Sequence, residues 1–447
     1  MKNILKYFIL FLLLSCGNNK TVIKDNDSKN FELKPKFLSD SIYVFKLLEE
    51  LQSDAYRYNT HSYRWTGSKQ EIKQFTDLFT KYGINKKDGK KHLFSIELST
   101  RYEDPITYWI LNEVQKDVET EILSLYNETY NVGVGTLPYW ELNAKTYNFL
   151  NSKDKSLIVM NSGIFSFSHE MLKIMLETIN LNDVDSDTLS RDKILSIMEN
   201  FSYALEDFSH NRRIRSRLDI NPEKAQDLAE MVAAMEFFAL AHEYGHIFFN
   251  HEPIKTGSLN LRNEDSASQN PKGFKIHDWR QEIEADIFAF NLMNQYISKK
   301  YVLKKNKPHL YKILRYMPVI FFHLSDIAAK SKYIYIDNTE IPENQSADTF
   351  LHEALTIIED ILVHKKDILI NTTLKVNVGG KTPDINSSIS FSNHPPDNIR
   401  SLYMQNLISS SFNDDDGSEL GQRLDNNIIQ LWGNLEEILN KIITKGR

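Results

Sequence analysis

The feature that most constrains this chain is a pair of histidines placed four residues apart in a long helix-forming segment. His242 and His246 lie in a run that starts at Pro222 and meets no helix breaker except Gly245. Residues four apart in a helix project from the same face, and apolar residues of the run share that face. The segment therefore predicts a helix over residues 222–250 that turns both imidazoles toward the protein interior.

This spacing suits the binding of a divalent metal ion. Two imidazole nitrogens at these positions can reach one zinc ion, and Glu243, beside the first histidine, can take a proton from a water molecule at the metal. Two buried histidines satisfied by hydrogen bonds alone are the simpler alternative. Gly245 costs the helix about 1 kcal/mol relative to alanine. We therefore expect another backbone, or a substrate, to approach closely at this glycine.

The third ligand is expected from a second predicted helix, over residues 278–298. Glu282 and Asp286 lie four residues apart and share a face, whereas Glu284 is expected to point to the opposite side. The chain has one cysteine, Cys16, so any metal must be held by histidine and carboxylate. We expect Glu282 to complete a catalytic zinc site and Asp286 to orient a ligand imidazole from behind. A solvated acidic start to the helix is the alternative interpretation.

The N-terminus has the features of a bacterial lipoprotein signal. Residues 1–15 carry two lysines and a short apolar run, which is too short to cross a bilayer as a helix. The run Leu-Leu-Ser-Cys that ends at Cys16 resembles a lipobox, which implies cleavage before Cys16 and lipidation of its sulfur. Residues 16–35 then form a polar tether. An ordinary secretory signal with a chance cysteine is the alternative.

The remaining residues, 36–447, are expected to form a single mainly helical α+β domain. A β-hairpin is predicted over residues 142–160, a further strand over 372–378, and one long helix over 308–331. The formal net charge of −7 argues against nucleic acid as a partner. We find no later segment that is apolar enough to span a membrane, so the lipid would hold the chain in the bacterial cell envelope, facing the periplasm or the cell surface.

The two helical motifs resemble those of a known peptidase family. The pattern HExxH at residues 242–246, followed by ExxAD at 282–286, is similar to that of the gluzincin zinc metallopeptidases related to the CaaX prenyl peptidases and the HtpX-type proteases. Residues 142–165 resemble the hairpin before the active-site helix of that family, whose edge strand can pair with substrate. With a His-Pro segment at 393–400, the resemblance covers residues 142–400. It implies a zincin-like domain, one zinc ion per chain and a peptide or protein substrate.

The other candidate residues are less firmly assigned. His394 is the candidate for stabilising the oxyanion of the transition state, with Arg400 or Tyr244 as alternatives, and His394 can equally be a packing residue of its loop. His251 follows the first motif and is expected to cap the C-terminus of the helix.

Three functions are therefore compatible with the sequence. The first is a lipid-anchored zinc endopeptidase. The second is a lipoprotein that keeps the zinc-binding fold but acts as a binding or quality-control module without turnover. The third is a structural helical lipoprotein that binds no metal. Glu243 favours the first, because zinc binding needs the histidines but does not need a base beside them.

Overall fold

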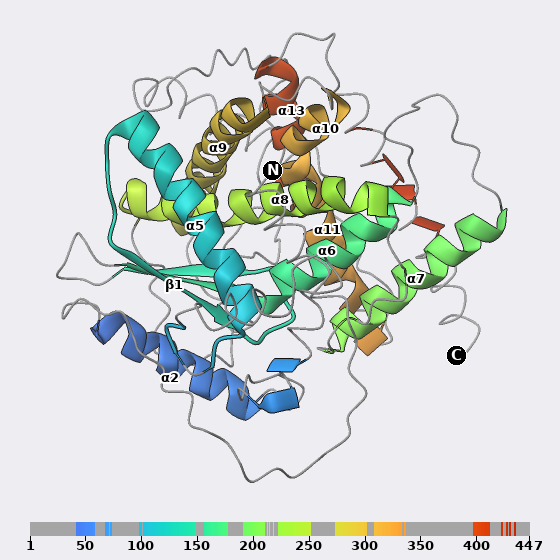
Figure 1. Cartoon of the computed structure of the whole chain (residues 1–447). Coiled ribbons are helices and arrows are strands. Elements are labelled where there is room, and N and C mark those ends of the chain that lie inside the picture. Colours follow the sequence, from blue (N-terminus) through green and yellow to red (C-terminus); the bar gives the residue numbers. More distant parts are fainter. Residues whose placement is uncertain are drawn as a thin grey trace.

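The computed structural model describes the helices and strands between residues 42 and 411 and a few positions beyond them. The described residues are 42–58, 68–70, 72–73, 98–100, 102–148, 156–177, 191–210, 212, 214, 218, 222–251, 273–301, 308–332, 335–336, 397–411, 422, 426–427, 429–430 and 433–434. Within them the chain is mainly helical with a small three-stranded sheet, which confirms the expected α+β class (Figure 1).

Helices surround the sheet and each other in chain order. The helices are α2 (Ile42–Tyr58), α5 (Pro105–Tyr126), α6 (Ser162–Leu176), α7 (Arg191–Ser209), α8 (Pro222–Phe248), α9 (Gly273–Tyr301), α10 (Pro308–Arg315), α11 (Met317–Lys332) and α13 (Asp397–Ser411). The strands are β1 (Val132–Leu137), β2 (Ala144–Asn148) and β3 (Ser156–Asn161).

The strand β3 lies at the centre of the sheet. It pairs antiparallel with β2, with Ala144 opposite Met160, which confirms the predicted hairpin. On its other side it pairs in parallel with β1, with Val132 opposite Ser156. All six residues of β3 are buried, as expected for a short strand that has neighbours on both sides. The strand β2 is therefore at one edge of the described sheet.

The strand β1 was not among the predicted elements, and its glycines explain why. An added Cβ at Gly133 would lie 2.6 Å from Cγ1 of Val44, and one at Gly135 would overlap the side chain of Leu48. Both contacts are made with α2, so the glycines allow this helix to pack directly on the sheet. A strand in which alternate positions lack a side chain does not show the apolar alternation by which strands are recognised.

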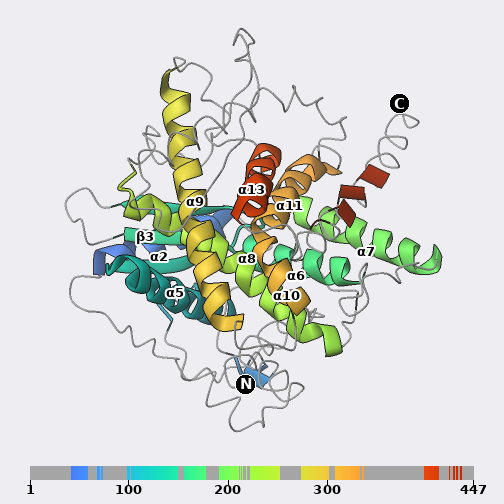
Figure 2. The ribbon, with the colours of Figure 1, turned by 90° about the horizontal axis from the view of Figure 1, so that it is seen from above.

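Helix α8 is the central helix of the fold. It contacts α5, α6, α9, α10 and α11 as well as β2 and β3, and every residue from 227 to 245 is buried. Figure 1 shows α8 crossing the molecule above the sheet, with α2 on the opposite face of the sheet, and Figure 2 shows α9 crossing close to α8. A helix that is covered on all sides can be apolar around its whole circumference. Its polar side chains must then be satisfied by neighbouring elements.

The helix predicted over residues 308–331 is divided in two. Helix α10 ends at Arg315 and α11 begins at Met317. Pro318 explains the interruption, because proline has no amide hydrogen to donate to the preceding turn and its ring restricts the residue before it.

Several predictions fall on residues that the structure does not describe. These are the lipidated Cys16 with its signal and tether, the strand over 372–378, and His394. In the described part of the chain, no helix has the length and apolar character needed to cross a bilayer.

A buried carboxyl group joins α2 to the edge of the sheet formed by β1. Glu103 is 0% exposed and accepts hydrogen bonds from Nε2 of Gln52 at 2.7 Å and from the amide nitrogen of Thr136 at 3.0 Å. Burial raises the pKa of Glu103 from 4.5 to about 7, although these hydrogen bonds oppose the rise. The folded protein therefore keeps a proton on this carboxyl group at pH values where the unfolded chain has released it.

We predict that the variant Glu103→Gln removes one pH-dependent contribution to stability. Because the folded pKa is raised, this contribution is complete below about pH 4.5 and is lost as pH rises through about 7. Relative to the variant, the wild type should therefore lose up to about 3 kcal/mol over this interval. Urea unfolding of both proteins at about pH 5 and about pH 8 measures the difference. Parallel pH profiles for the two proteins would contradict the prediction.

Candidate metal centre

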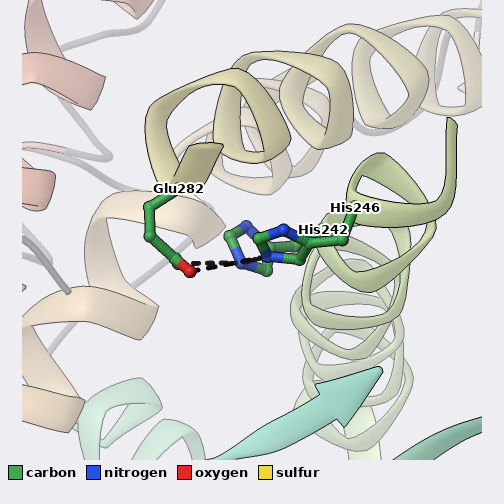
Figure 3. Close-up of side chains that lie close together, drawn as sticks. All are labelled: His242, His246 and Glu282. Atoms are coloured by element: carbon green, nitrogen blue, oxygen red, sulfur yellow. Dashed lines mark hydrogen bonds and ion pairs between the residues drawn. The ribbon is translucent and has the colours of Figure 1, made fainter. Parts of the chain in front are cut away.

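Three side chains predicted as metal ligands meet at one point between α8 and α9. Nε2 of His242 lies 3.1 Å from Nε2 of His246. The carboxylate of Glu282 lies 3.2 Å from the first of these nitrogens and 3.6 Å from the second. Figure 3 shows the two imidazoles on α8 and the carboxylate on α9 pointing toward one another. His242 and Glu282 are buried, and His246 is partly exposed.

The spacing of these atoms suits a metal ion. A tetrahedral zinc ion with bonds of about 2.0–2.1 Å separates its donor atoms by about 3.3 Å. The observed separations of 3.1, 3.2 and 3.6 Å lie close to that value. Two imidazoles and one carboxylate are also a donor set found in zinc enzymes. The His242–His246–Glu282 group can therefore hold a metal ion.

Asp286 lies directly behind His242, as predicted. Its Oδ1 is 2.7 Å from Nδ1 of His242, and the carboxylate is also bound by two side chains of α13. Arg400 donates from Nε to Oδ2 at 2.9 Å and from Nη2 to Oδ1 at 2.5 Å, and the hydroxyl of Tyr403 donates to Oδ2. Asp286 is 0% exposed. Its carboxylate is thus satisfied by three partners in the absence of water.

The charges of this cluster explain its protonation. Burial opposes the ionisation of Asp286, but the positive charges of Arg400 and His242 outweigh it and hold the pKa of Asp286 below its usual value. Burial likewise opposes the protonation of His242, but Asp286 and Glu282 raise its pKa to about 10. Metal binding at Nε2 of His242 therefore requires the loss of a proton from this ring, while Nδ1 keeps its proton for Asp286.

The two alternative candidates for the oxyanion site are engaged elsewhere. The guanidinium of Arg400 is bonded to Asp286 and lies over the ring of Phe322, with 4.2 Å between Cζ and the ring centroid. The hydroxyl of Tyr244 donates to Oε1 of Glu119 on α5 at 2.6 Å, and this tyrosine is 1% exposed. His394 lies outside the described residues.

The edge strand β2 contacts α8 at Glu243. Oγ1 of Thr146 donates to Oε2 of Glu243 at 2.7 Å and lies 3.2 Å from its backbone oxygen. Glu243 is buried. The hydroxyl of Thr146 was not singled out in the sequence, since only the tertiary pairing of strand and helix brings the two residues together.

Two expectations for the residues around His246 were wrong. His251 does not cap α8 with its side chain, because its Nδ1 lies 2.8 Å from Nδ1 of His246. Glu284 does not face away from the site, because its Oε2 lies 3.0 Å from Nε2 of His251. Every residue from 282 to 290 is buried, so opposite faces of α9 are both covered in this region. Periodicity alone does not distinguish these faces.

The helix glycine in the first motif has the close neighbour that was expected. An added Cβ at Gly245 would lie 2.8 Å from Cα of Ala285 and 3.1 Å from its Cβ. Gly245 and Ala285 therefore allow the backbones of α8 and α9 to approach each other next to the three donors. The close approach involves another backbone, which was one of the two reasons expected for this glycine.

Comparisons with models of protein families, with curated proteins and with solved structures gave no match for this chain. The resemblance to the gluzincins therefore rests on the motifs at residues 242–246 and 282–286 and on the flanking segments. The donor geometry is an independent observation, since it depends on the packing of two helices separated in sequence.

We predict that Gly245→Ala destabilises the protein by about 1–3 kcal/mol, because the new methyl group must push α9 away from α8. Alanine is otherwise the better helix former by about 1 kcal/mol. Gly433 is a suitable control, since it is exposed, helical and has no atom within 4 Å of an added Cβ. Gly433→Ala should be neutral or stabilising in urea unfolding. The prediction fails if both variants change stability in the same direction.

We also predict that the purified protein binds about one zinc ion per chain and that Glu282→Ala greatly weakens this binding. Mass spectrometry after dialysis against zinc and then buffer measures the metal content. His210→Ala is the control, because the ring of His210 bonds to the backbone oxygen of Glu206 in its own helix. Equal zinc content in the wild type and Glu282→Ala would exclude Glu282 as a ligand.

Proposed function

We propose that this chain is a zinc-dependent endopeptidase with a zincin-like catalytic domain. The observation that carries the proposal is the convergence of two imidazole nitrogens and one carboxylate within 3.1–3.6 Å, next to a glutamate that follows the first histidine. A site that only stores zinc needs the three ligands but has no need for Glu243. The lipobox-like segment places the same protein at a membrane of the bacterial cell envelope, with lipid on Cys16.

In this proposal, His242, His246 and Glu282 hold the zinc ion. Zinc supplies Lewis acidity, which lowers the pKa of a water molecule toward neutrality and polarises the scissile carbonyl group. Glu243 takes the proton of the attacking water and returns it to the leaving amine. Thr146 holds Oε2 of Glu243 at 2.7 Å, so the carboxylate has a fixed orientation before substrate arrives.

The edge strand β2 is the proposed site for the substrate backbone. It has β3 as its only strand neighbour in the described sheet, and its residue Thr146 contacts Glu243. An extended peptide that pairs with β2 would run past the end of α8 that carries the ligands. Hydrolysis of an extended segment within a chain is the reaction that such an approach favours, which is why we propose an endopeptidase.

We predict that Glu243→Gln keeps the zinc ion and the fold but loses peptide hydrolysis by at least about 100-fold, because glutamine cannot accept the proton of the water. Cleavage of casein and of a mixed quenched-fluorescence peptide library measures activity, beside zinc content. Glu236→Gln is the matched control, since Glu236 is also buried on α8 and lies seven residues earlier.

Two outcomes would overturn the peptidase assignment. Cleavage by Glu243→Gln at the wild-type rate would show that Glu243 is not the base. A wild-type protein that binds zinc but cleaves none of these substrates would instead favour the second reading, a zinc-binding lipoprotein without turnover.

A further inference from the structure

Two buried residues form a continuous hydrogen-bonded chain behind His246. Nδ1 of His246 lies 2.8 Å from Nδ1 of His251, and Nε2 of His251 lies 3.0 Å from Oε2 of Glu284. The other oxygen of Glu284 accepts a hydrogen bond from Nε of Arg280 at 3.0 Å. His251 and Glu284 are 8% and 4% exposed. The chain thus runs from a proposed ligand, through a second imidazole, to a buried carboxylate.

The turn at the end of α8 brings His251 back against His246. Asn250 has a positive φ of 52°, and its amide donates to the oxygen of Ile247 at 3.0 Å. The amide of His251 donates to the oxygen of His246 at 2.9 Å. These two bonds form a Schellman motif, in which the residue after the helix folds back over its last turn. His251 is therefore held in place by the backbone before any side-chain bond is considered.

The hydrogen bonds of this chain allow one favourable arrangement of protons. An ionised carboxylate can only accept, so Glu284 requires a proton on Nε2 of His251. The Nδ1 atom of a neutral His251 then has a free electron pair, which can accept only if His246 carries its proton on Nδ1. In that tautomer, Nε2 of His246 has no proton and faces the centre of the three donors.

The opposite arrangement would prevent metal binding. If His251 carried its proton on Nδ1, it would donate to His246, and Nε2 of His251 would face the carboxylate of Glu284 without a proton. His246 would then carry its own proton on Nε2, directed toward Nε2 of His242 at 3.1 Å. Glu284 disfavours this state because two acceptors would face each other at 3.0 Å.

We propose that His251 and Glu284 are a positioning pair that fixes the tautomer and the ring orientation of His246 for metal binding. The inference rests on the proposed metal site, and it assigns to His251 and Glu284 a role that the sequence motifs did not reveal. His242 receives the same support directly from Asp286, at 2.7 Å from its Nδ1. On the side of His246, an imidazole is inserted between the ligand and the carboxylate. Hydrogen bonds of this kind commonly change metal affinity by about 10–100-fold.

The test compares zinc affinities, measured by competition with a chromophoric chelator, in the wild type and three variants. His251→Phe keeps an aromatic ring beside Phe249, whose ring centroid is 5.5 Å away, but removes the acceptor. We expect its zinc affinity to fall by about 10–100-fold. In His251→Asn the amide oxygen replaces Nδ1 as the acceptor, so we expect at least about half of this loss, on a logarithmic scale, to be recovered. Glu284→Gln should also weaken binding, because a glutamine side chain can donate as well as accept and no longer selects one tautomer.

Thermal unfolding without metal separates positioning from a purely structural role. A structural role predicts that zinc affinity follows stability across the variants, whereas positioning predicts recovery in His251→Asn whatever its melting temperature. Glu236→Gln serves as the control for neutralising a buried glutamate. Wild-type affinity in both His251→Phe and Glu284→Gln would overturn the inference and leave the metal site intact. A wild-type protein that binds no zinc would instead remove the proposed function itself.

Discussion

The close packing of α8 against α9 is the constraint on which the rest of the site depends. The two backbones approach at Gly245 and Ala285, where no room remains for an additional Cβ on the glycine. On one side of this contact lie the nitrogens of His242 and His246, and on the other lies the carboxylate of Glu282. A small increase in the distance between the helices would separate donor atoms whose useful spacing is fixed by a metal ion to within a few tenths of an ångström. The packing of apolar helices therefore determines the geometry of the polar site.

Burial of the site imposes a second requirement, which is that every charged group must have partners. Asp286 meets it through His242, Arg400 and Tyr403, and Glu284 meets it through His251 and Arg280. Unpaired charges in such surroundings would cost several kcal/mol each. The partners do more than offset this cost, because they also fix the rings of the two histidines. Stability and ligand orientation thus depend on the same hydrogen bonds.

The sequence predicted the parts of the site that lie within single helices. Spacing of four residues fixed the relation of His242 to His246 and of Glu282 to Asp286, and the structure brings these pairs together. The sequence did not predict contacts that depend on tertiary packing, namely Thr146 with Glu243 and His251 with Glu284. It also missed β1, whose glycines are explained only by the position of α2. The break at Pro318, in contrast, had a signal in the sequence, because an internal proline disfavours an uninterrupted helix.

The contribution of α13 has a consequence for the order in which the site can form during synthesis. Arg400 reaches Asp286 across 114 positions of the chain. Before α13 has left the ribosome, Asp286 lacks its strongest counter-charge, and the region around His242 has an exposed or poorly compensated carboxylate. A nascent chain that ends before Arg400 therefore cannot assemble the centre seen in the complete fold. The last described long helix of the polypeptide acts as a check on completeness, since the ligands made earlier reach their final environment only after it has docked.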